Sequence, residues 1–283
     1  MTVTRDRTKK KITLSQRAYL IKALERFGLR KANTSPVPIK HSIELVANQE
    51  TTSEDDVRRY QSMVGSVMFP MIETRPDIAF AVSTVSRFAH NPTSTHMTAV
   101  RLILQYLAGS LNRGITYGGD ENLDLTPIGF SDADWGRDKT TRRSVSGFVF
   151  MLNGGPISWK SKLQATVSLS TCQSEYTALT AAVKEATWLR LLLTELGVLD
   201  QSKQFARILI KTDNQAAKAL AENPVQHDRT KHIDIQFHYV RDEINSGRID
   251  LVHVASVDMA ADGLTKPLTG PQFYAFLKHL RMV

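Results

Sequence analysis

Residues 128–135 read Ile-Gly-Phe-Ser-Asp-Ala-Asp-Trp. Alternation along a strand places Ile128, Phe130 and Asp132 on one face of a sheet, with the intervening residues on the other. A carboxylate on the same face as two large apolar side chains is costly to bury unless it is paired or bound to a metal. The stretch therefore predicts a strand on which Asp132 has such a partner.

The composition is that of an ordinary globular protein with unevenly distributed charge. Of the 283 residues, 42% are hydrophobic and 23% are charged, and the formal net charge is +8. Residues 1–120 contain 17 Lys and Arg against 10 Asp and Glu, whereas residues 121–283 contain 19 against 18. The basic half suggests a surface for nucleic acid. A basic tail on a soluble domain is the alternative, because five of the positive charges lie between Arg5 and Lys11.

No membrane or secretory segment is expected in this sequence. No run approaches eighteen consecutive apolar residues, and residues 1–11 are basic with no apolar segment behind them. The single cysteine, Cys172, excludes a disulfide framework. We therefore expect an intracellular protein with no membrane partner.

The first half of the chain predicts helices. Apolar residues recur every three to four positions within residues 12–31, 53–70, 75–91 and 95–108. Ser53 followed by three acids is typical of a helix start, and Pro70 is expected to end that helix. The Gly- and Asn-containing residues 118–122 predict a domain boundary.

The second half changes to a strand pattern and then alternates with helices. Strands are predicted at residues 125–130, 146–152 and 157–160, with a further strand-like stretch at 165–169, then at 207–212 and 249–254. Helices are predicted at residues 173–196, 214–221, 233–245, 258–265 and 272–280. This order predicts a mixed sheet with helices on its faces.

Three further acids lie where a solitary carboxylate would be costly. Glu175 is in the first turn of the longest predicted helix, on its apolar stripe. Asp213 directly follows an apolar strand, at the strand end where α/β sheets bind ligands. Asp262 lies in a short helix after the last strand. Together with Asp132 these acids form an oxygen-rich set that suits Mg²⁺ or Mn²⁺.

Several short motifs resemble those of one known family. In the second half they are residues 131–135 (SDADW), 142–147 (RRSVSG), 157–162 (ISWKSK), 174–176 (SEY), 213–217 (DNQAA), 229–234 (RTKHID) and 261–268 (ADGLTKPL). In the first half they are residues 14–16, 25–28, 60–66 and 74–82. In this order they resemble the Pol polyproteins of copia-type LTR retrotransposons, where the C-terminal part of the reverse transcriptase precedes an RNase H domain. The resemblance covers nearly the whole chain.

This resemblance implies an α/β fold and a nuclease activity. The fold would be an RNase H-like mixed five-stranded sheet with helices on both faces, preceded by a mainly helical segment similar to the thumb and connection of a reverse transcriptase. The domains would be residues 1–120 and 121–270, with a C-terminal helix at 271–283. The resemblance implies that Asp132, Glu175, Asp213 and Asp262 hold two Mg²⁺ ions, which Mn²⁺ could replace, and that the RNA strand of an RNA–DNA hybrid is cut.

The resemblance also suggests which residues contact the hybrid, whose shape and 2′-hydroxyls would be recognised rather than its sequence. These residues are Arg142, Arg143, Lys160, Lys162, Asn214, Gln215, Arg229, Lys231 and His232. For the basic residues the alternative is a solvated surface. For Trp135 and Trp159, stacking on nucleic acid and packing in the core are both consistent with the sequence. The remainder of the polyprotein is the other expected partner, and a cytoplasmic virus-like particle or the nucleus is the expected location.

Two departures from the family pattern limit the expected activity. The polymerase motif of an aromatic residue, any residue and Asp-Asp is absent, because the one Asp-Asp pair, Asp55 and Asp56, follows Ser-Glu at a helix start. We therefore expect no polymerase activity from this chain. The His-containing loop of cellular RNases H is also absent, and His253 lies inside the last predicted strand. An inactive or co-opted fragment that binds nucleic acid without catalysis is the alternative.

Overall fold

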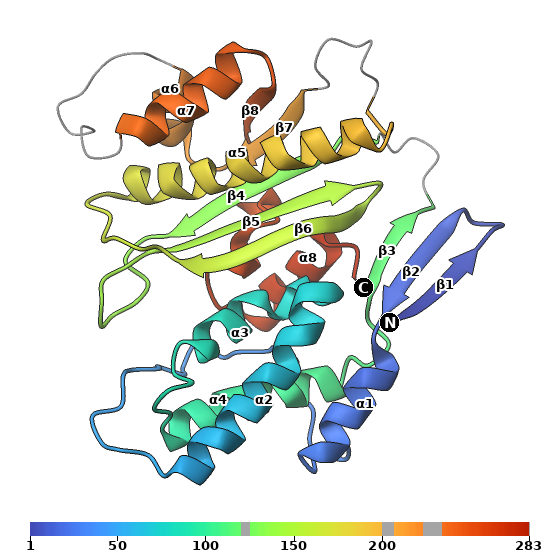
Figure 1. Ribbon diagram of the computed structural model, residues 1–283, viewed down its shortest axis with the longest axis vertical. Helices are drawn as coiled ribbons and strands as arrows, with labels where there is room; N and C mark the ends of the chain where they lie inside the picture. The colour runs from blue at the N-terminus through green and yellow to red at the C-terminus, as the bar shows by residue number, and fades with distance from the viewer. Residues whose placement is uncertain (120–124, 200–206, 223–233, 283) are drawn as a thin grey trace. The chain divides into compact units, whose positions relative to one another are not determined.

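The computed structural model describes residues 1–119, 125–199, 207–222 and 234–282, which belong to two compact units (Figure 1). Unit 1 consists of residues 1–120 and 266–283, and unit 2 consists of residues 121–265. The C-terminal segment, which the sequence pattern predicts as a separate helix, thus belongs to the same unit as the first 120 residues. Among the described residues, none of the helices is both long and apolar enough to cross a membrane.

Unit 1 is mainly helical. Its helices are α1 (Arg17–Arg26), α2 (Glu54–Glu73), η1 (Pro76–Ile78), α3 (Ala79–Ser86), α4 (Ser94–Ala108) and α8 (Gly270–His279). Ser53 caps α2 through a hydrogen bond from the Asp56 backbone amide, as its position before three acids predicts. The final helix belongs to this core, because Phe273 is 4% exposed and its ring packs edge-on against Tyr106 with a centroid distance of 5.4 Å.

The prediction that Pro70 ends its helix is wrong. The helix α2 continues to Glu73, with Pro70 inside it. A proline cannot donate its backbone nitrogen to the carbonyl one turn earlier, which here belongs to Ser66. The Tyr19 hydroxyl donates to that carbonyl at 3.1 Å instead, so the unmet acceptor is satisfied from α1.

The helix predicted from residue 12 is also wrong over its first residues. The strands β1 (Thr2–Asp6), β2 (Lys11–Ser15) and β3 (Ile115–Gly118) form an antiparallel sheet in the order β1-β2-β3. Ile12 and Leu14 alternate with Thr13 along β2, which is a strand period, and the hydroxyls of Thr13 and Thr116 hydrogen-bond at 3.0 Å. The sequence pattern missed this sheet because the strands are short.

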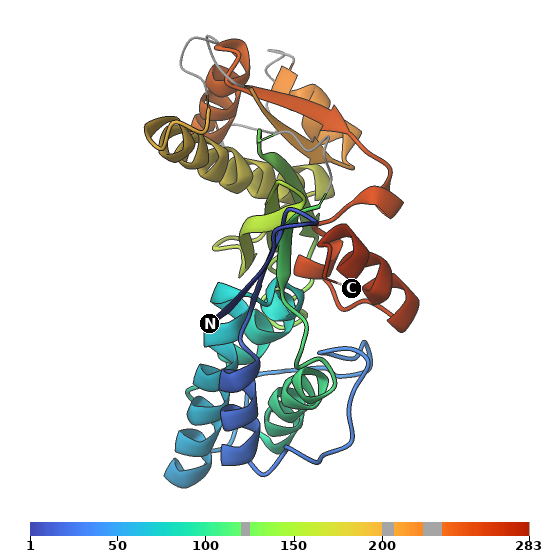
Figure 2. The same cartoon turned by 90° about the vertical axis from the view of Figure 1, so that its right-hand side faces the viewer.

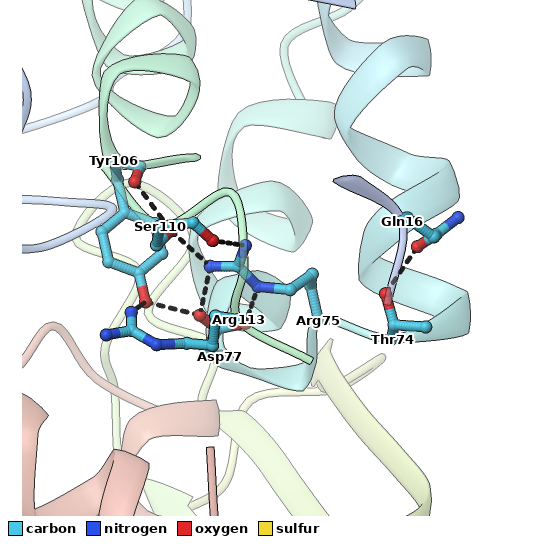
Figure 3. Close-up of polar contacts among 7 residues, drawn as sticks. All are labelled: Gln16, Thr74, Arg75, Asp77, Tyr106, Ser110 and Arg113. Atoms are coloured by element: carbon cyan, nitrogen blue, oxygen red, sulfur yellow. Dashed lines mark hydrogen bonds and ion pairs between the residues drawn. The ribbon is translucent and has the colours of Figure 1, made fainter. Parts of the chain in front are cut away.

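A fully buried ion pair lies in the polar core of unit 1 (Figure 3). The Arg75 guanidinium donates to both carboxylate oxygens of Asp77, at 2.9 and 2.7 Å, and to the carbonyl and hydroxyl oxygens of Ser110. The Tyr106 hydroxyl also donates to Asp77, and Arg113 donates to that hydroxyl at 2.7 Å. The buried charges are therefore opposite in sign and held by several hydrogen bonds.

Unit 2 contains the predicted five-stranded mixed sheet. Its strands are β4 (Ile128–Asp134), β5 (Val145–Leu152), β6 (Gly155–Leu163), β7 (Ile208–Thr212) and β8 (Ile249–His253). The strand order is β6-β5-β4-β7-β8, with β4, β5 and β6 antiparallel and β7 and β8 parallel to β4. This arrangement confirms the predicted α/β, RNase H-like fold. Residues 165–169 form no strand and lead into the long helix instead.

The main core of unit 2 lies between one face of this sheet and the helices α5 (Thr171–Glu195), α6 (Gln215–Glu222) and α7 (Asp234–Asn245). In both views α5 runs along the sheet (Figure 1 and Figure 2). Phe148, Phe150 and Ile210 point into this core. Gly129 is opposite Phe150, and a Cβ at Gly129 would lie only 2.5 Å from the Phe150 ring. The glycine thus makes room for an aromatic side chain beneath α5.

The face of β4 that carries Ile128, Phe130 and Asp132 lies away from α5. The expected alternation is present, but Ile128 and Phe130 are only half-buried, while the Gly129 side of the strand faces the main core. On the Asp132 face, the short 3₁₀ helix η4 (Asp262–Leu264) contacts β4 and β5. The candidate site lies on this second face of the sheet.

Candidate metal centre

Three of the four predicted acids converge on one point. Asp132, Asp213 and Asp262 each offer a carboxylate oxygen, and these three oxygens lie within 4.8 Å of one another. Asp132 is 3% exposed, whereas the other two are half-buried. Among the described residues this is the one group of acids, histidines and cysteines with metal-binding geometry.

Strand order explains how two of these acids meet. Asp132 lies near the carboxyl end of β4, and Asp213 directly follows β7, the parallel neighbour of β4. Parallel neighbours end at the same edge of a sheet, so the two side chains come together there.

Gly147 allows Asp262, the third acid, to lie close to Asp132. Gly147 on β5 is paired with Asp132, and a Cβ at Gly147 would lie 2.8 Å from atoms of both Leu264 and Thr265. Real Cβ atoms essentially never approach so closely, so any other residue at this position would push η4 away from the sheet. The absence of a side chain at Gly147 lets Asp262 reach Asp132.

Hydroxyl groups bind two of the three carboxylates. Thr265 Oγ1 donates a hydrogen bond to Asp132 Oδ2, and Ser256 Oγ donates to Asp213 Oδ2 at 2.7 Å. The His253 ring nitrogen Nε2 lies 3.1 Å from the backbone oxygen of Asp213. His253 therefore contacts the segment that carries a predicted ligand, although it lies within β8 as its sequence position predicts.

The three carboxylates carry like charges, which the neutral hydroxyl groups do not offset. Two carboxylates at this separation repel each other by on the order of 3 to 4 kcal/mol at the effective dielectric of a protein surface. Hydroxyl donors orient carboxylate oxygens but bring no positive charge. A divalent cation would bring that charge, and a set of oxygen donors alone is the kind that Mg²⁺ and Mn²⁺ prefer. The residues present therefore fit the predicted metal.

Glu175, the fourth predicted acid, is not part of this group of three. It lies in the first turn of α5 and is 8% exposed. The turn is held by Gln164, whose side-chain nitrogen donates to the Ser174 carbonyl and the Ser146 hydroxyl, both at 2.9 Å. Burial and the negative charge of Glu175 raise the pKa of Cys172 above its ordinary value, which agrees with an unreactive thiol.

The predicted nucleic-acid contacts have different structural settings. Lys160 and Lys162 are exposed on β6, but strand pairing places them on the α5 side of the sheet, opposite to Asp132. Asn214 uses its side-chain oxygen to cap α6 through the Ala217 amide at 2.8 Å. Arg142 and Gln215 are exposed, and Arg143 is half-buried. Arg229, Lys231 and His232 lie outside the described residues.

The sequence pattern missed Gly147, Thr265, Ser256 and Gln164 as parts of the site. Gly147 and Thr265 lie inside motifs that carry the family resemblance, but nothing in their local sequence shows that they meet. Trp135 and Trp159 were left open between stacking and packing. Trp135 donates its ring N–H to the Ser168 carbonyl at 2.9 Å, which anchors the loop before α5, and at 47% exposure it is not a core residue.

The chain is similar to curated retrotransposon proteins over almost its full length. It is 38% identical over 280 residues, or 96% of this chain, to the retrovirus-related Pol polyprotein from transposon TNT 1-94 of Nicotiana tabacum. It is 39% identical over 263 residues, or 93% of this chain, to the retrovirus-related Pol polyprotein from transposon RE1 of Arabidopsis thaliana. It spans 20% and 17% of these two relatives.

Comparison with solved structures gives a distant likeness. RNase H1 from Halobacterium salinarum NRC-1 is 15% identical, with a TM-score of 0.35, over 50% of this chain and 94% of that one. The fold assignment rests on the strand order rather than on this likeness. No family model matches the chain. From the curated relatives, the chain belongs to the family of copia-type retrotransposon Pol polyproteins, and its unit 2 has the RNase H-like fold.

Proposed function

We propose that unit 2 is a ribonuclease H, which hydrolyses the RNA strand of an RNA–DNA hybrid endonucleolytically with two divalent metal ions. The observation that carries the proposal is the convergence of Asp132, Asp213 and Asp262 within 4.8 Å, on the sheet of an RNase H-like fold. Membership in the Pol polyprotein family supports the same reaction, because reverse transcription produces such hybrids.

The acids would hold the metal ions, and other parts of the fold keep the acids in position. Asp132, Asp213 and Asp262 would hold the ions, and Glu175 would complete the set from the first turn of α5. Ions bound there would lower the pKa of the attacking water and neutralise charge on the phosphate that is cut. The sheet and Gly147 keep the acids at one edge before substrate arrives.

The substrate would be recognised by its backbone and by its 2′-hydroxyls. Arg142, Arg143 and Gln215, whose side chains are exposed or partly exposed, would make these contacts. The remaining polyprotein would be the natural partner. A cytoplasmic particle or the nucleus as its location stays a prediction.

The decisive experiment is cleavage of a labelled RNA–DNA hybrid by the full chain, with Mg²⁺ and then Mn²⁺. EDTA and the variant Asp132→Asn serve as controls. We expect the RNA strand to be cut only with metal and only by the wild type. A variant that still cuts at the wild-type rate would refute the assignment of Asp132, and a wild type that never cuts with either metal would refute the proposed activity.

The alternative function is hybrid binding without turnover. The position of Glu175 outside the group of three acids is the observation that favours it, because a site with an incomplete ligand set binds metal less well. Hybrid binding measured beside cleavage decides between the two. Retained binding with no cutting would identify a binding fragment.

A further inference from the structure

Thr265 links two of the acids that form the candidate metal centre. It directly follows η4, which begins with Asp262, and its backbone amide donates to the Asp262 carbonyl at 3.2 Å. Its hydroxyl donates to Asp132 Oδ2 on β4. One residue therefore fixes Asp262 through the backbone and Asp132 through the side chain.

Two hydrogen-bond acceptors lie close to the Thr265 hydroxyl. It lies 3.1 Å from the Asp262 carbonyl oxygen as well as within hydrogen-bonding distance of Asp132. A hydroxyl has one proton to donate, and a hydrogen bond to an ionised carboxylate is stronger than one to a neutral carbonyl. The bond to Asp132 is therefore the stronger of the two, and it fixes the orientation of the Asp132 carboxylate.

Tight packing fixes the position of the Thr265 side chain. The residue has 0% exposure, and its methyl group lies where a Cβ on Gly147 would be 2.8 Å away. Because Gly147 is paired with Asp132 across β4 and β5, the threonine fills the space directly beside the carboxylate. Both the orientation and the distance of its hydroxyl are thus determined by packing.

We propose that Thr265 is a positioning residue of the metal centre, which orients the Asp132 carboxylate for metal binding through its hydroxyl. The inference rests on the proposed function of unit 2. Groups that hydrogen-bond to metal ligands orient them, and their loss weakens metal binding or activity by about 10- to 100-fold. The side chain of Thr265 would touch neither substrate nor metal.

The test compares metal binding and turnover in matched variants of the full chain. Thr265→Val keeps the shape and removes the hydroxyl, while Thr265→Ser keeps the hydroxyl. Thr180→Val is the control, because Thr180 is 4% exposed in α5 and donates its hydroxyl to the Tyr176 carbonyl instead. Calorimetric titration with Mn²⁺ in the absence of substrate gives the dissociation constant, and hybrid cleavage at saturating and limiting metal gives kcat and KM.

We expect Thr265→Val to weaken Mn²⁺ binding by about 10- to 100-fold and to lower kcat at limiting metal, with KM for the hybrid unchanged. Thr265→Ser should restore both values, and Thr180→Val should change neither. If Thr265→Val fails to fold by circular dichroism, Thr265→Cys replaces it, because a thiol has similar size and is a weak donor.

Two outcomes separate this inference from the function on which it rests. If Thr265→Val binds Mn²⁺ as tightly as the wild type while Asp132→Asn does not bind it, the metal centre stands and the role of Thr265 is refuted. If Asp132→Asn binds Mn²⁺ as tightly as the wild type, the three acids are not the metal site and the proposed function itself fails.

Discussion

Both units bury ionised side chains, but they do so in opposite ways. In unit 1, Arg75 and Asp77 have no side-chain exposure and neutralise each other. In unit 2, the three converging acids carry charges of one sign, and the groups that bind them there include the neutral hydroxyls of Thr265 and Ser256. The first arrangement brings charges of opposite sign together, whereas the second brings together three carboxylates, an arrangement that a divalent cation would stabilise.

The difference shows which buried charges point to function. Burial alone would raise the pKa of Asp77, but the adjacent Arg75 guanidinium holds it below its ordinary value. That carboxylate is therefore charged because the protein itself supplies its partner. Three carboxylates whose oxygens lie within 4.8 Å of one another repel each other, so their convergence indicates a ligand-binding site.

Spectroscopy can separate the two units. All three tryptophans, Trp135, Trp159 and Trp188, lie in unit 2. Tryptophan fluorescence therefore follows the unfolding of unit 2 alone. Hydrogen exchange of the amides in α3 and α4 reports on the unfolding of unit 1, so the stability of each unit can be measured separately.

The largest expected effect is that of Asp132→Asn on catalysis. Cleavage should fall by about 1,000-fold or more, because metal ions contribute several kcal/mol to catalysis and about 1.4 kcal/mol changes a rate tenfold. In EDTA the same variant should unfold at the same or a higher urea concentration, because one of three like charges is gone. A clear loss of stability in the tryptophan signal would show that Asp132 is structural, as Asp77 is.

Asp77→Asn should lower stability and leave metal binding unchanged, which is the reverse of the effects expected for Asp132→Asn. Breaking a buried ion pair by removing one partner costs about 3 to 5 kcal/mol, because Arg75 is left charged and buried. Hydrogen exchange in α3 and α4 should accelerate accordingly, with the Mn²⁺ affinity of unit 2 unchanged. The control is Asp55→Asn, since Asp55 is exposed and forms an ion pair with exposed Arg58, where about 0.2 to 1 kcal/mol is expected. Equal effects of the two variants would contradict the assigned role of the buried pair.

Gly147→Ala tests how closely η4 must approach the sheet. The new Cβ would lie 2.8 Å from atoms of Leu264 and Thr265, and such overpacking costs about 1 to 3 kcal/mol. Mn²⁺ affinity should fall by about tenfold at the same time, because Asp262 and Thr265 are displaced. Gly65→Ala, with no atom within 4 Å of its Cβ, is the control and should leave metal binding unchanged. Normal metal binding by Gly147→Ala would show that η4 tolerates the displacement.

The smallest expected effect is a difference in acid sensitivity. The pKa of Asp77 is lowered in the folded protein, so its contribution is present above the unfolded value of about 3.9 and is lost as the pH falls through the folded value. As the pH falls below 5, the free energy of unfolding of unit 1 should decrease more in the wild type than in Asp77→Asn. Hydrogen exchange at a series of pH values measures this, and parallel curves for the two proteins would contradict it.

The sequence predicted most of unit 2 because its elements are long and its acids lie at element ends. The position of Asp213 after an apolar strand and that of Asp132 within a strand are local features that the sequence shows, whereas the pairing of β4 with β7 that brings them together is not. Gly147 and Thr265 are 118 residues apart in sequence, and their contact depends on how η4 lies on the sheet. No local pattern contains that information. The same holds for the sheet of unit 1, where β3 joins β2 across almost a hundred residues.

The division of the chain also has a consequence for the order in which the protein is made. Unit 2 occupies a continuous segment, residues 121–265, whereas unit 1 needs α8, which follows that segment. During synthesis the ribosome therefore releases all of unit 2 before it releases α8, which belongs to unit 1. Until Phe273 has been synthesised, Tyr106 lacks its aromatic neighbour, so the core of unit 1 is completed only after unit 2 has left the ribosome.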